Sequence, residues 1–128
     1  MVLRTLLERK ARVRFLSCRL AARKRGLVFC IEEEEFYRLA LSPCFYCGKE
    51  ADEERVNGLD RVDNALGYLS TNVVSACAYC NHMKSDSSSA SFIGHCEQVV
   101  FHEFSKRSIE EQAYFLRLIQ KYGSTKRK

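Results

Sequence analysis

Two pairs of cysteines have the spacing of metal ligands: Cys44 with Cys47, and Cys77 with Cys80. A two-residue gap lets both thiolates of a pair bind one ion at Zn–S distances of about 2.3 Å. Two such pairs make a closed tetrahedral site that has no open position for a substrate, so the predicted zinc is structural. The 29 residues between the pairs exceed the spacing of a simple zinc ribbon, so we expect a folded segment between them.

The cysteine count also indicates a compartment. The seven cysteines are an odd number, and residues 1–26 lack the long apolar stretch of a secretory signal. We therefore expect metal binding in a reducing compartment, the cytoplasm or the nucleus, in preference to a disulfide scaffold. The cysteines outside the two pairs are interpreted as small apolar residues: Cys18, Cys30 and Cys96.

Between and after the cysteine pairs, polar residues follow an ordered pattern. The segment reads Gly58-Leu59-Asp60-Arg61-Val62-Asp63-Asn64, then Gly67-Tyr68 and Asn72-Val73-Val74, and the second pair is followed by Asn81 and Lys84. Two short strands are predicted, Gly58 to Val62 and Asn72 to Ala76, with turn residues between them. A helix is expected to begin near Cys80-Asn81. The result is a strand–loop–strand–helix unit closed by zinc.

This ordered set resembles the HNH endonuclease family, also called ββα-metal or His-Me finger nucleases. The resemblance covers residues 44–86 and extends more loosely to residues 21–31 and 92–95. It implies an α+β fold with a small zinc-stabilised ββα-metal core, flanked by N-terminal and C-terminal helices. It also implies hydrolysis of nucleic-acid phosphodiester bonds, DNA foremost, with one divalent metal, Mg²⁺ or Mn²⁺.

The resemblance assigns roles to three residues. Asp60 matches the acidic metal ligand of the first strand, and Asn81 falls where the last histidine or asparagine of the motif binds the metal. Both offer the hard oxygen donors that Mg²⁺ requires. Asn72 matches the middle asparagine, whose amide pins the loop. The alternatives from the residues alone are a strand-end acid for Asp60 and a helix N-cap for Asn81.

Arg61 departs from the family pattern, in which this position is usually a histidine that acts as the general base. An arginine stays protonated and offers no acceptor, so we expect Arg61 to bind the scissile phosphate or to stabilise transition-state charge. The base must then come from another residue. Asp63 is expected on the same face of the strand as Arg61. The other candidates are Tyr46, Tyr68 and His82.

Charge is concentrated at the two ends of the chain. The net charge is +5, and residues 1–26 hold nine basic residues against one acid, Glu8, while Lys126, Arg127 and Lys128 close the sequence. Such basic segments indicate a polyanionic partner, here double-stranded DNA or another nucleic acid. An organellar transit peptide and a solvated helix face are the alternatives for the first segment. The predicted nucleic-acid contacts are Arg12, Arg19, Arg23, Lys24, Arg25 and Lys84.

The length of 128 residues predicts a single domain. We expect a basic helical lead-in over residues 1–42, the zinc-clamped core over 43–95, a C-terminal helical scaffold over 96–123 and a basic tail over 124–128. Pro43 ends the lead-in, and Ser108 with Glu111 forms a capping box for the last helix. No apolar run approaches the roughly 20 residues of a membrane span.

Two functions fit this pattern. The first is an HNH-type endonuclease with a structural zinc and a catalytic Mg²⁺ or Mn²⁺. The second is a catalytically inactive, zinc-stabilised nucleic-acid-binding protein, which Arg61 favours. Cutting both strands of DNA would need two copies, so a homodimer is also considered. A protein-interaction zinc finger of the crossed-ligand type is a weaker third interpretation, because it needs more ligand pairs.

Overall fold

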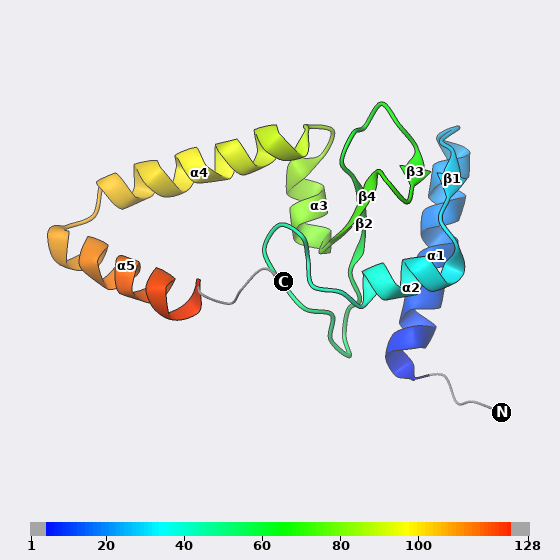
Figure 1. Cartoon of the computed structure of the whole chain (residues 1–128), viewed down its shortest axis with the longest axis horizontal. Coiled ribbons are helices and arrows are strands. Elements are labelled where there is room, and N and C mark those ends of the chain that lie inside the picture. The colour runs from blue at the N-terminus through cyan, green and yellow to red at the C-terminus, as the bar shows by residue number, and fades with distance from the viewer. Residues whose placement is uncertain (1–4, 124–128) are drawn as a thin grey trace. The chain divides into compact units, whose positions relative to one another are not determined.

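The computed structural model describes residues 5–123. The elements follow one another as α1 (Leu6–Lys24), β1 (Phe29–Cys30), α2 (Glu33–Ala40), β2 (Gly58–Arg61), β3 (Tyr68–Leu69), β4 (Val73–Ala76), α3 (Ala78–Lys84), α4 (Ser89–Ser105) and α5 (Ile109–Tyr122) (Figure 1). This mixture of helices and small sheets confirms the expected α+β class. The predicted basic tail, residues 124–128, lies outside the described residues.

The chain divides into two compact units, Met1–Phe92 and Ile93–Lys128. The boundary falls inside α4. The first unit contains both cysteine pairs and the segment between them. Within the described residues, no helix is both long enough and apolar enough to cross a membrane.

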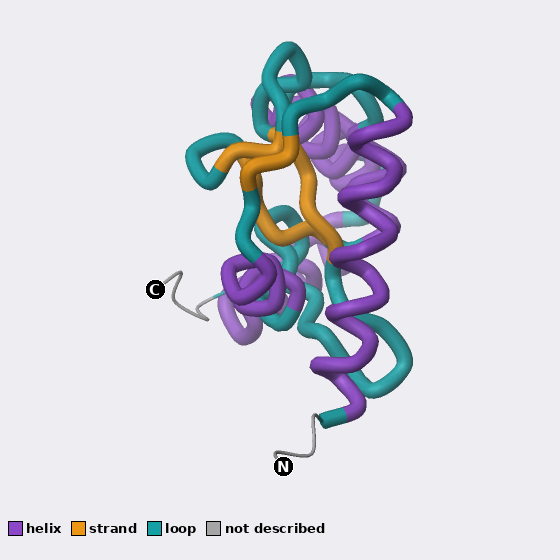
Figure 2. Tube along the Cα trace, turned by 90° about the vertical axis from the view of Figure 1, so that its right-hand side faces the viewer, coloured by secondary structure: helices purple, strands orange, loops and turns teal. Residues whose placement is uncertain are grey.

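Helix α1 forms because its N-terminus is capped and one of its faces is apolar. The Thr5 hydroxyl accepts the Glu8 N–H at 3.2 Å, and the Glu8 carboxylate accepts the Thr5 N–H at 2.9 Å, which completes a capping box. Ala11, Phe15 and Ala22 are buried on one side of the helix. In Figure 2, α1 runs along one side of the strands. The basic residues of α1 lie on the other sides of the helix, next to this buried side.

The core of the first unit is aromatic and lies between α1, α2 and the strands. The rings of Phe15 and Phe36 meet edge to face with centroids 5.4 Å apart, and Phe29 and Tyr68 continue the cluster at 5.4 Å. Phe36 is fully buried. Such edge-to-face pairs add about 0.5–1.5 kcal/mol each beyond area burial.

Two small sheets hold the segment between the cysteine pairs. β2 and β4 pair antiparallel with Asp60 opposite Val74, so the predicted hairpin is present. β1 and β3 pair parallel, with Phe29 opposite Tyr68; the two-residue β3 was not predicted, because it is too short to show alternation. A Cβ on Gly67 would lie 2.5 Å from the Val28 carbonyl oxygen, so this approach of the two strands requires glycine.

Helix α3 begins earlier than the sequence indicated. Its N-cap is Cys77, whose sulfur accepts the Cys80 N–H at 3.4 Å. The expected start near Cys80-Asn81 was therefore late by two to three residues, because a cysteine takes the place of the usual Ser, Thr, Asp or Asn cap. The second cysteine pair thus forms the first turn of α3.

The second unit is a pair of helices joined by a short turn. The predicted capping box of α5 is present: the Ser108 hydroxyl accepts the Glu111 N–H at 3.3 Å, and the Glu111 carboxylate accepts the Ser108 N–H at 2.9 Å. Near the turn, the rings of Phe104 and Phe115 have centroids 5.8 Å apart. No residue between 93 and 123 is buried.

Candidate active site

The four paired cysteines meet in the first unit. Their sulfur atoms all lie within 4.8 Å of one another, and the Cys47 and Cys77 sulfurs are 3.7 Å apart. Four sulfurs placed tetrahedrally at about 2.3 Å from one zinc are separated by roughly 3.8 Å. The predicted cluster is therefore present, and its size fits zinc. Among the described residues it is the one such group of three or more Cys, His, Asp or Glu side chains.

The environment of the thiols favours a cation among them. Burial opposes ionisation of Cys44, but hydrogen bonds from the backbone of Cys77, Cys47 and Tyr46 outweigh it and lower the pKa of Cys44 to about 7. Burial and the neighbouring Cys47 and Cys77 thiols raise the pKa of Cys80. Thiolates crowded in this way repel one another unless a positive ion lies between them.

The cysteine cluster positions α3 against the hairpin. The Phe45 N–H donates to the Ser75 carbonyl at 2.8 Å, which ties the first cysteine pair to β4. The second pair opens α3, and α3 packs on β2. Metal binding at the cluster would therefore fix the two polar residues that follow on α3, Asn81 and Lys84, beside β2.

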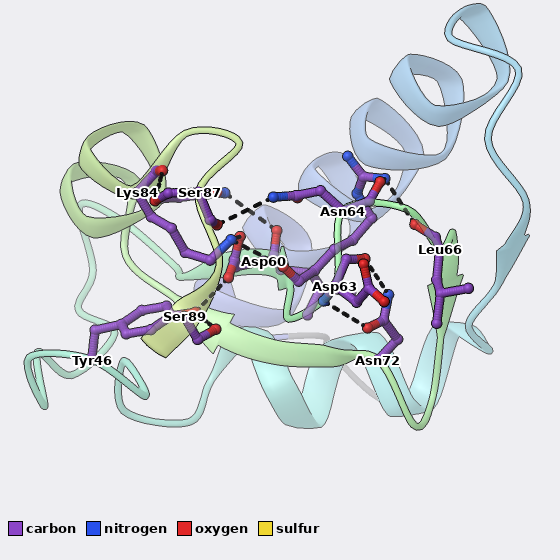
Figure 3. Close-up of polar contacts among 12 residues, drawn as sticks. Tyr46, Asp60, Asp63, Asn64, Leu66, Asn72, Lys84, Ser87 and Ser89 are labelled. Atoms are coloured by element: carbon purple, nitrogen blue, oxygen red, sulfur yellow. Dashed lines mark hydrogen bonds and ion pairs between the residues drawn. The ribbon is translucent and has the colours of Figure 1, made fainter. Parts of the chain in front are cut away.

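Asp60 lies at the centre of a buried polar network on β2 (Figure 3). Its Oδ2 accepts the Tyr46 hydroxyl at 2.6 Å, and its Oδ1 accepts the Lys84 ammonium at 3.2 Å. The Tyr46 hydroxyl oxygen also lies 2.7 Å from Ser89 Oγ. An ionised carboxylate offers roughly four lone-pair positions, so two of those on Asp60 stay available for a metal.

Asn81 lies on α3 and its side chain contacts the same strand, β2. Its Nδ2 donates to the carbonyl of Leu59, the residue before Asp60, at 3.3 Å. Only the NH₂ group of an amide can donate to a carbonyl, so Oδ1 is the atom left to bind a cation. The interpretation of Asn81 as a helix N-cap is wrong, because Cys77 holds that position.

Lys84 is not a surface residue. It is 1% exposed, and besides Asp60 its ammonium contacts the Arg61 carbonyl at 3.1 Å. A buried ammonium held by two acceptors does not reach a phosphate on the surface, so this burial contradicts the predicted nucleic-acid contact. Nothing in the sequence pattern indicated it, since a lysine late in a short helix is usually solvated.

Arg61 braces the loop that follows β2. Its Nη1 donates to the carbonyls of Asn64 at 2.9 Å and Leu66 at 2.8 Å, and its guanidinium carbon lies 5.5 Å from the centroid of the Tyr68 ring. The half-buried side chain thus stabilises the conformation of this loop. The other guanidinium N–H groups leave it able to donate to an anion.

Asn72 pins the same loop, as expected of the middle asparagine. Its Oδ1 accepts the Asp63 N–H at 2.9 Å, and its Nδ2 donates to the carbonyls of Asp63 and Gly67, each at 2.9 Å. The amide therefore holds both backbone groups of Asp63 and closes the loop across its base. The side chain is buried and acts on the position of the loop.

The two tyrosines proposed as bases are poorly suited to that role. Burial and the hydrogen bond to Asp60 raise the pKa of Tyr46 far above its usual range, so the phenol stays protonated. The buried Tyr68 hydroxyl accepts a hydrogen bond from Arg25 at 2.9 Å. Tyr68 is part of the aromatic core.

Asp63 and His82 are both exposed. β2 ends at Arg61, so the expectation that Asp63 shares a strand face with Arg61 does not apply. Asp63 lies in the turn instead, where Oδ1 accepts the Ala65 N–H at 2.9 Å. Its second carboxylate oxygen is available as an acceptor. His82 follows Asn81 on α3.

The predicted contacts on α1, and at its C-cap Arg25, have different environments. Arg19, Arg23 and Lys24 are exposed; Arg19 lies over the Phe15 ring at 5.2 Å from its centroid. Arg12 Nε is 4.0 Å from Glu33. Arg25 donates a hydrogen bond to the hydroxyl of the buried Tyr68, so its side chain is tied to the core of the first unit.

Besides the Tyr46 and Lys84 contacts of Asp60, two further contacts of the site were not predicted. Ser89, at the start of α4, joins the Tyr46–Asp60 network, and Asn64 Nδ2 donates to the Ser87 carbonyl at 3.2 Å. The first contact brings the start of α4 to the first cysteine pair, and the second brings the connection between α3 and α4 to the hairpin loop. The sequence offered only a serine-rich run there, which is typical of any turn.

The solved structures identify the class of this fold. The chain is similar to the rare-cutting HNH restriction endonuclease PacI, with a TM-score of 0.57 and 23% sequence identity over 77% of this chain and 81% of that chain. The chain therefore has the HNH fold, and its four-cysteine cluster is compatible with a zinc-stabilised form of that fold. At this identity the likeness concerns the fold alone.

Among curated proteins, the chain is similar to the uncharacterized protein R423 of Acanthamoeba polyphaga mimivirus. The two are 42% identical over 65 residues, which are 51% of this chain and 12% of that protein's length. The chain thus spans a small part of this relative. No protein-family model matches the sequence.

Proposed function

We propose that this protein is an HNH-type endonuclease that hydrolyses phosphodiester bonds of nucleic acid, with DNA as the preferred substrate. The observation that supports the proposal most is the approach of Asn81 to β2. Its amide nitrogen donates to the Leu59 carbonyl at 3.3 Å, so the amide oxygen is the atom left to bind a cation, on a side chain that contacts the residue before Asp60. Two hard oxygen donors thus come from adjacent elements, a strand and a zinc-anchored helix.

Asp60 and Asn81 would hold the catalytic Mg²⁺ or Mn²⁺. Such an ion, when bound, stabilises the charge that develops on the leaving oxygen. Lys84 already balances the charge of Asp60, so the site offers the ion little net negative charge. Mg²⁺ in proteins is commonly held by one or two carboxylates together with substrate phosphates. We therefore expect metal binding to be weak without DNA and to strengthen with it.

The chain supplies the remaining tasks through its own side chains. Tyr46 and Lys84 hold the Asp60 carboxylate in one orientation. Arg61 remains a candidate for a contact with the scissile phosphate. We assign the general base to Asp63, because its carboxylate is exposed, keeps a free oxygen and is held in place through its backbone by Asn72.

The exposed basic residues of α1 would bind the phosphate backbone. Arg19, Arg23 and Lys24 provide charge that carries no sequence information but sets the position on the duplex. Arg12 and Arg25 would take part less, because Glu33 and Tyr68 already engage them. Removing one side chain that binds a phosphate should make the slope of log affinity against log salt shallower by about 0.9 on double-stranded DNA.

The proposal is tested with Asn81→Ala and a supercoiled plasmid in the presence of Mg²⁺ or Mn²⁺. The wild-type protein should give nicked or linear product, and the variant should lose cleavage by about 100-fold or more while it keeps zinc and DNA binding. Asn64→Ala is a matched control, because it also removes one hydrogen bond from an asparagine amide to a backbone carbonyl. Equal cleavage by wild type and Asn81→Ala would overturn the metal-ligand role.

A second function, nucleic-acid binding without hydrolysis, is favoured by two contacts. Lys84 neutralises Asp60, and Arg61 uses its guanidinium on the loop carbonyls. Under this alternative, DNA binding weakens with salt but no divalent ion gives any cleavage. The plasmid assay therefore separates the two functions directly.

A further inference from the structure

An open hollow of about 440 Å³ lies between α1 and the loop that precedes β2. Its volume is within the range of about 300–1,000 Å³ that is typical of small-molecule sites, so it can admit a phosphate together with part of its sugar. Both walls belong to the first unit. The lining residues include Arg9, Lys10, Arg14 and Ser17 of α1 with Glu54 and Val56 of the loop.

The loop wall of the hollow is held against α1 by Lys10. The Lys10 ammonium donates to the carbonyl of Glu53 and, at 3.0 Å, to that of Glu54. The loop is also fixed from within, because Asp52 Oδ1 accepts the N–H groups of Glu54 at 2.9 Å and Arg55 at 2.8 Å. Such side-chain turns hold the backbone in one conformation. The fold therefore forms the hollow before any ligand binds.

The charges around the hollow are unbalanced. Among its described lining residues, the basic side chains of Arg9, Lys10 and Arg14 outnumber the acidic one of Glu54. Within residues 5–123, no hydrogen bond or ion pair holds the guanidinium group of Arg9 or Arg14. Guanidinium groups bind phosphate through paired N–H donors. Two such groups without a carboxylate partner therefore favour an anion, and phosphate is the anion that a nucleic acid supplies.

Arg14 connects the hollow with the candidate active site. Its guanidinium lies over Gly58, the first residue of β2, where a Cβ would be 3.0 Å from Nη2 and 3.3 Å from Nε. Asp60 follows Gly58 by two residues, about 7 Å along the strand. Strand alternation puts the side-chain positions of Gly58 and Asp60 on the same face. The glycine thus leaves room for a guanidinium beside the strand that holds the proposed metal ligand.

We propose that this hollow binds a phosphate of the nucleic-acid strand that the candidate active site cuts, with Arg14 and Arg9 as its ligands. Lys10 positions the loop wall. This inference rests on the nucleic-acid binding of the proposed function. Phosphates follow one another about every 3.4 Å along the axis of one strand, so the phosphate at Arg14 lies within a few nucleotides of the one at Asp60. The helix turns by about 100° per residue, so Arg14 and Arg19 lie on different sides of α1 and the site is an additional contact.

The test is the affinity of the zinc-loaded full chain for a DNA duplex of about 20 base pairs, measured by fluorescence anisotropy between about 50 and 200 mM salt. Mg²⁺ and Mn²⁺ are left out, so that binding is measured without cleavage. Arg14→Met keeps the aliphatic stem and removes the charge. It should weaken binding by about 10-fold at low salt and make the slope of log affinity against log salt shallower by about 0.9.

Arg38→Met is the matched control for this variant. It removes an exposed arginine from α2, a helix whose first turn is acidic and therefore repels phosphates. Neither the affinity nor the salt slope should change. Far-UV circular dichroism and zinc content should be the same in wild type and in both variants, so that a loss of affinity is not a loss of fold.

Glu54→Gln gives a prediction of the opposite sign. The change keeps the size of the side chain and removes a negative charge from the hollow, so duplex affinity should rise by about 3-fold. Glu34→Gln removes the same charge from an exposed residue of α2 outside the hollow and should leave the affinity unchanged. A Glu54→Gln protein that binds duplex no better than Glu34→Gln would contradict a phosphate in the hollow.

The outcomes separate this site from the proposed function. If wild type binds duplex and Arg14→Met has the same affinity and salt slope, the site is overturned and the proposed function stands. A wild-type protein that binds no duplex at any salt concentration overturns the proposed function, and this site with it. Inorganic phosphate is the further probe: if Arg14→Met abolishes binding of free phosphate but leaves duplex affinity unchanged, the hollow binds a free anion and the nucleic-acid assignment is wrong.

Discussion

The ammonium of Lys84 lies 3.2 Å from Oδ1 of Asp60, and the two side chains are 0% and 4% exposed. A buried ion pair carries a large desolvation cost, which its mutual attraction and its other hydrogen bonds must offset. Here Tyr46 and the Arg61 carbonyl supply those additional bonds. The pair therefore joins the strand and the helix of the ββα unit at the point where the proposed metal would bind.

Lys84→Met should lower the free energy of unfolding by about 3–5 kcal/mol, because it leaves the Asp60 carboxylate buried without a counter-charge. Urea unfolding followed by circular dichroism measures the change. Lys106→Met is the matched control, since Lys106 pairs with Glu103 at 2.7 Å on the surface and should cost at most about 1 kcal/mol. Equal losses in the two variants would show that burial does not decide the strength of the pair.

Zinc should be needed for the first unit to fold. Cys77→Ser removes a thiolate ligand, while the serine hydroxyl can still cap α3 in place of the sulfur, so we expect loss of bound zinc and, through it, of cooperative unfolding. Cys30→Ser is the control, because Cys30 is exposed and lies outside the cluster. Metal analysis should give one zinc per chain for wild type and Cys30→Ser. A folded Cys77→Ser protein without zinc would contradict the structural role.

The parts of the site that the sequence predicted are those set by local spacing. The C-x-x-C gap brings two sulfurs together within one turn of chain, so the cluster could be inferred without knowing the rest of the fold. The loop-pinning amide of Asn72 came with the family resemblance. Its partners, Asp63 and Gly67, lie within the same hairpin loop.

The contacts that escaped prediction join residues from separate elements. Tyr46 reaches Asp60 across 14 residues of sequence, and Lys84 reaches it across 24. Neither residue differs in type from a surface residue, and only the packing of α3 on β2 decides that Lys84 is buried. Side-chain spacing within one element carries no information on such pairs.

Tyr46→Phe should leave the shape of the pH–rate profile unchanged. Burial and the hydrogen bond to Asp60 raise the folded-state pKa of Tyr46 above the unfolded value of about 10. The stability from this phenol is therefore fully present below pH 10 or so and is lost only as the pH rises further through the folded pKa. Between about pH 6 and 9 the hydroxyl stays protonated and cannot act as a base.

The same variant should still unfold more easily, by about 1.5–3 kcal/mol, because a hydrogen bond to a buried carboxylate is removed. Tyr79→Phe is the control, since Tyr79 is 74% exposed on α3. Plasmid cleavage measured across the pH range checks the assignment. If Tyr46→Phe loses the rising limb of the pH–rate profile and Tyr79→Phe keeps it, Tyr46 is the general base and the assignment is wrong.

Asp63→Asn should lower the cleavage rate by about 100-fold or more if its carboxylate is the general base, because an amide cannot accept the proton of the attacking water. The change preserves the size of the side chain, and the amide oxygen can still accept the Ala65 N–H. The hydrogen bonds from Asn72 go to the backbone of Asp63 and are unaffected. Stability, zinc content and DNA binding should therefore stay close to those of wild type, so that the loss appears in the rate of chemistry.

His82→Ala is the companion variant, since His82 is the other exposed candidate for the general base. If His82→Ala abolishes cleavage while Asp63→Asn retains it, the proton acceptor lies on α3 and not in the hairpin loop.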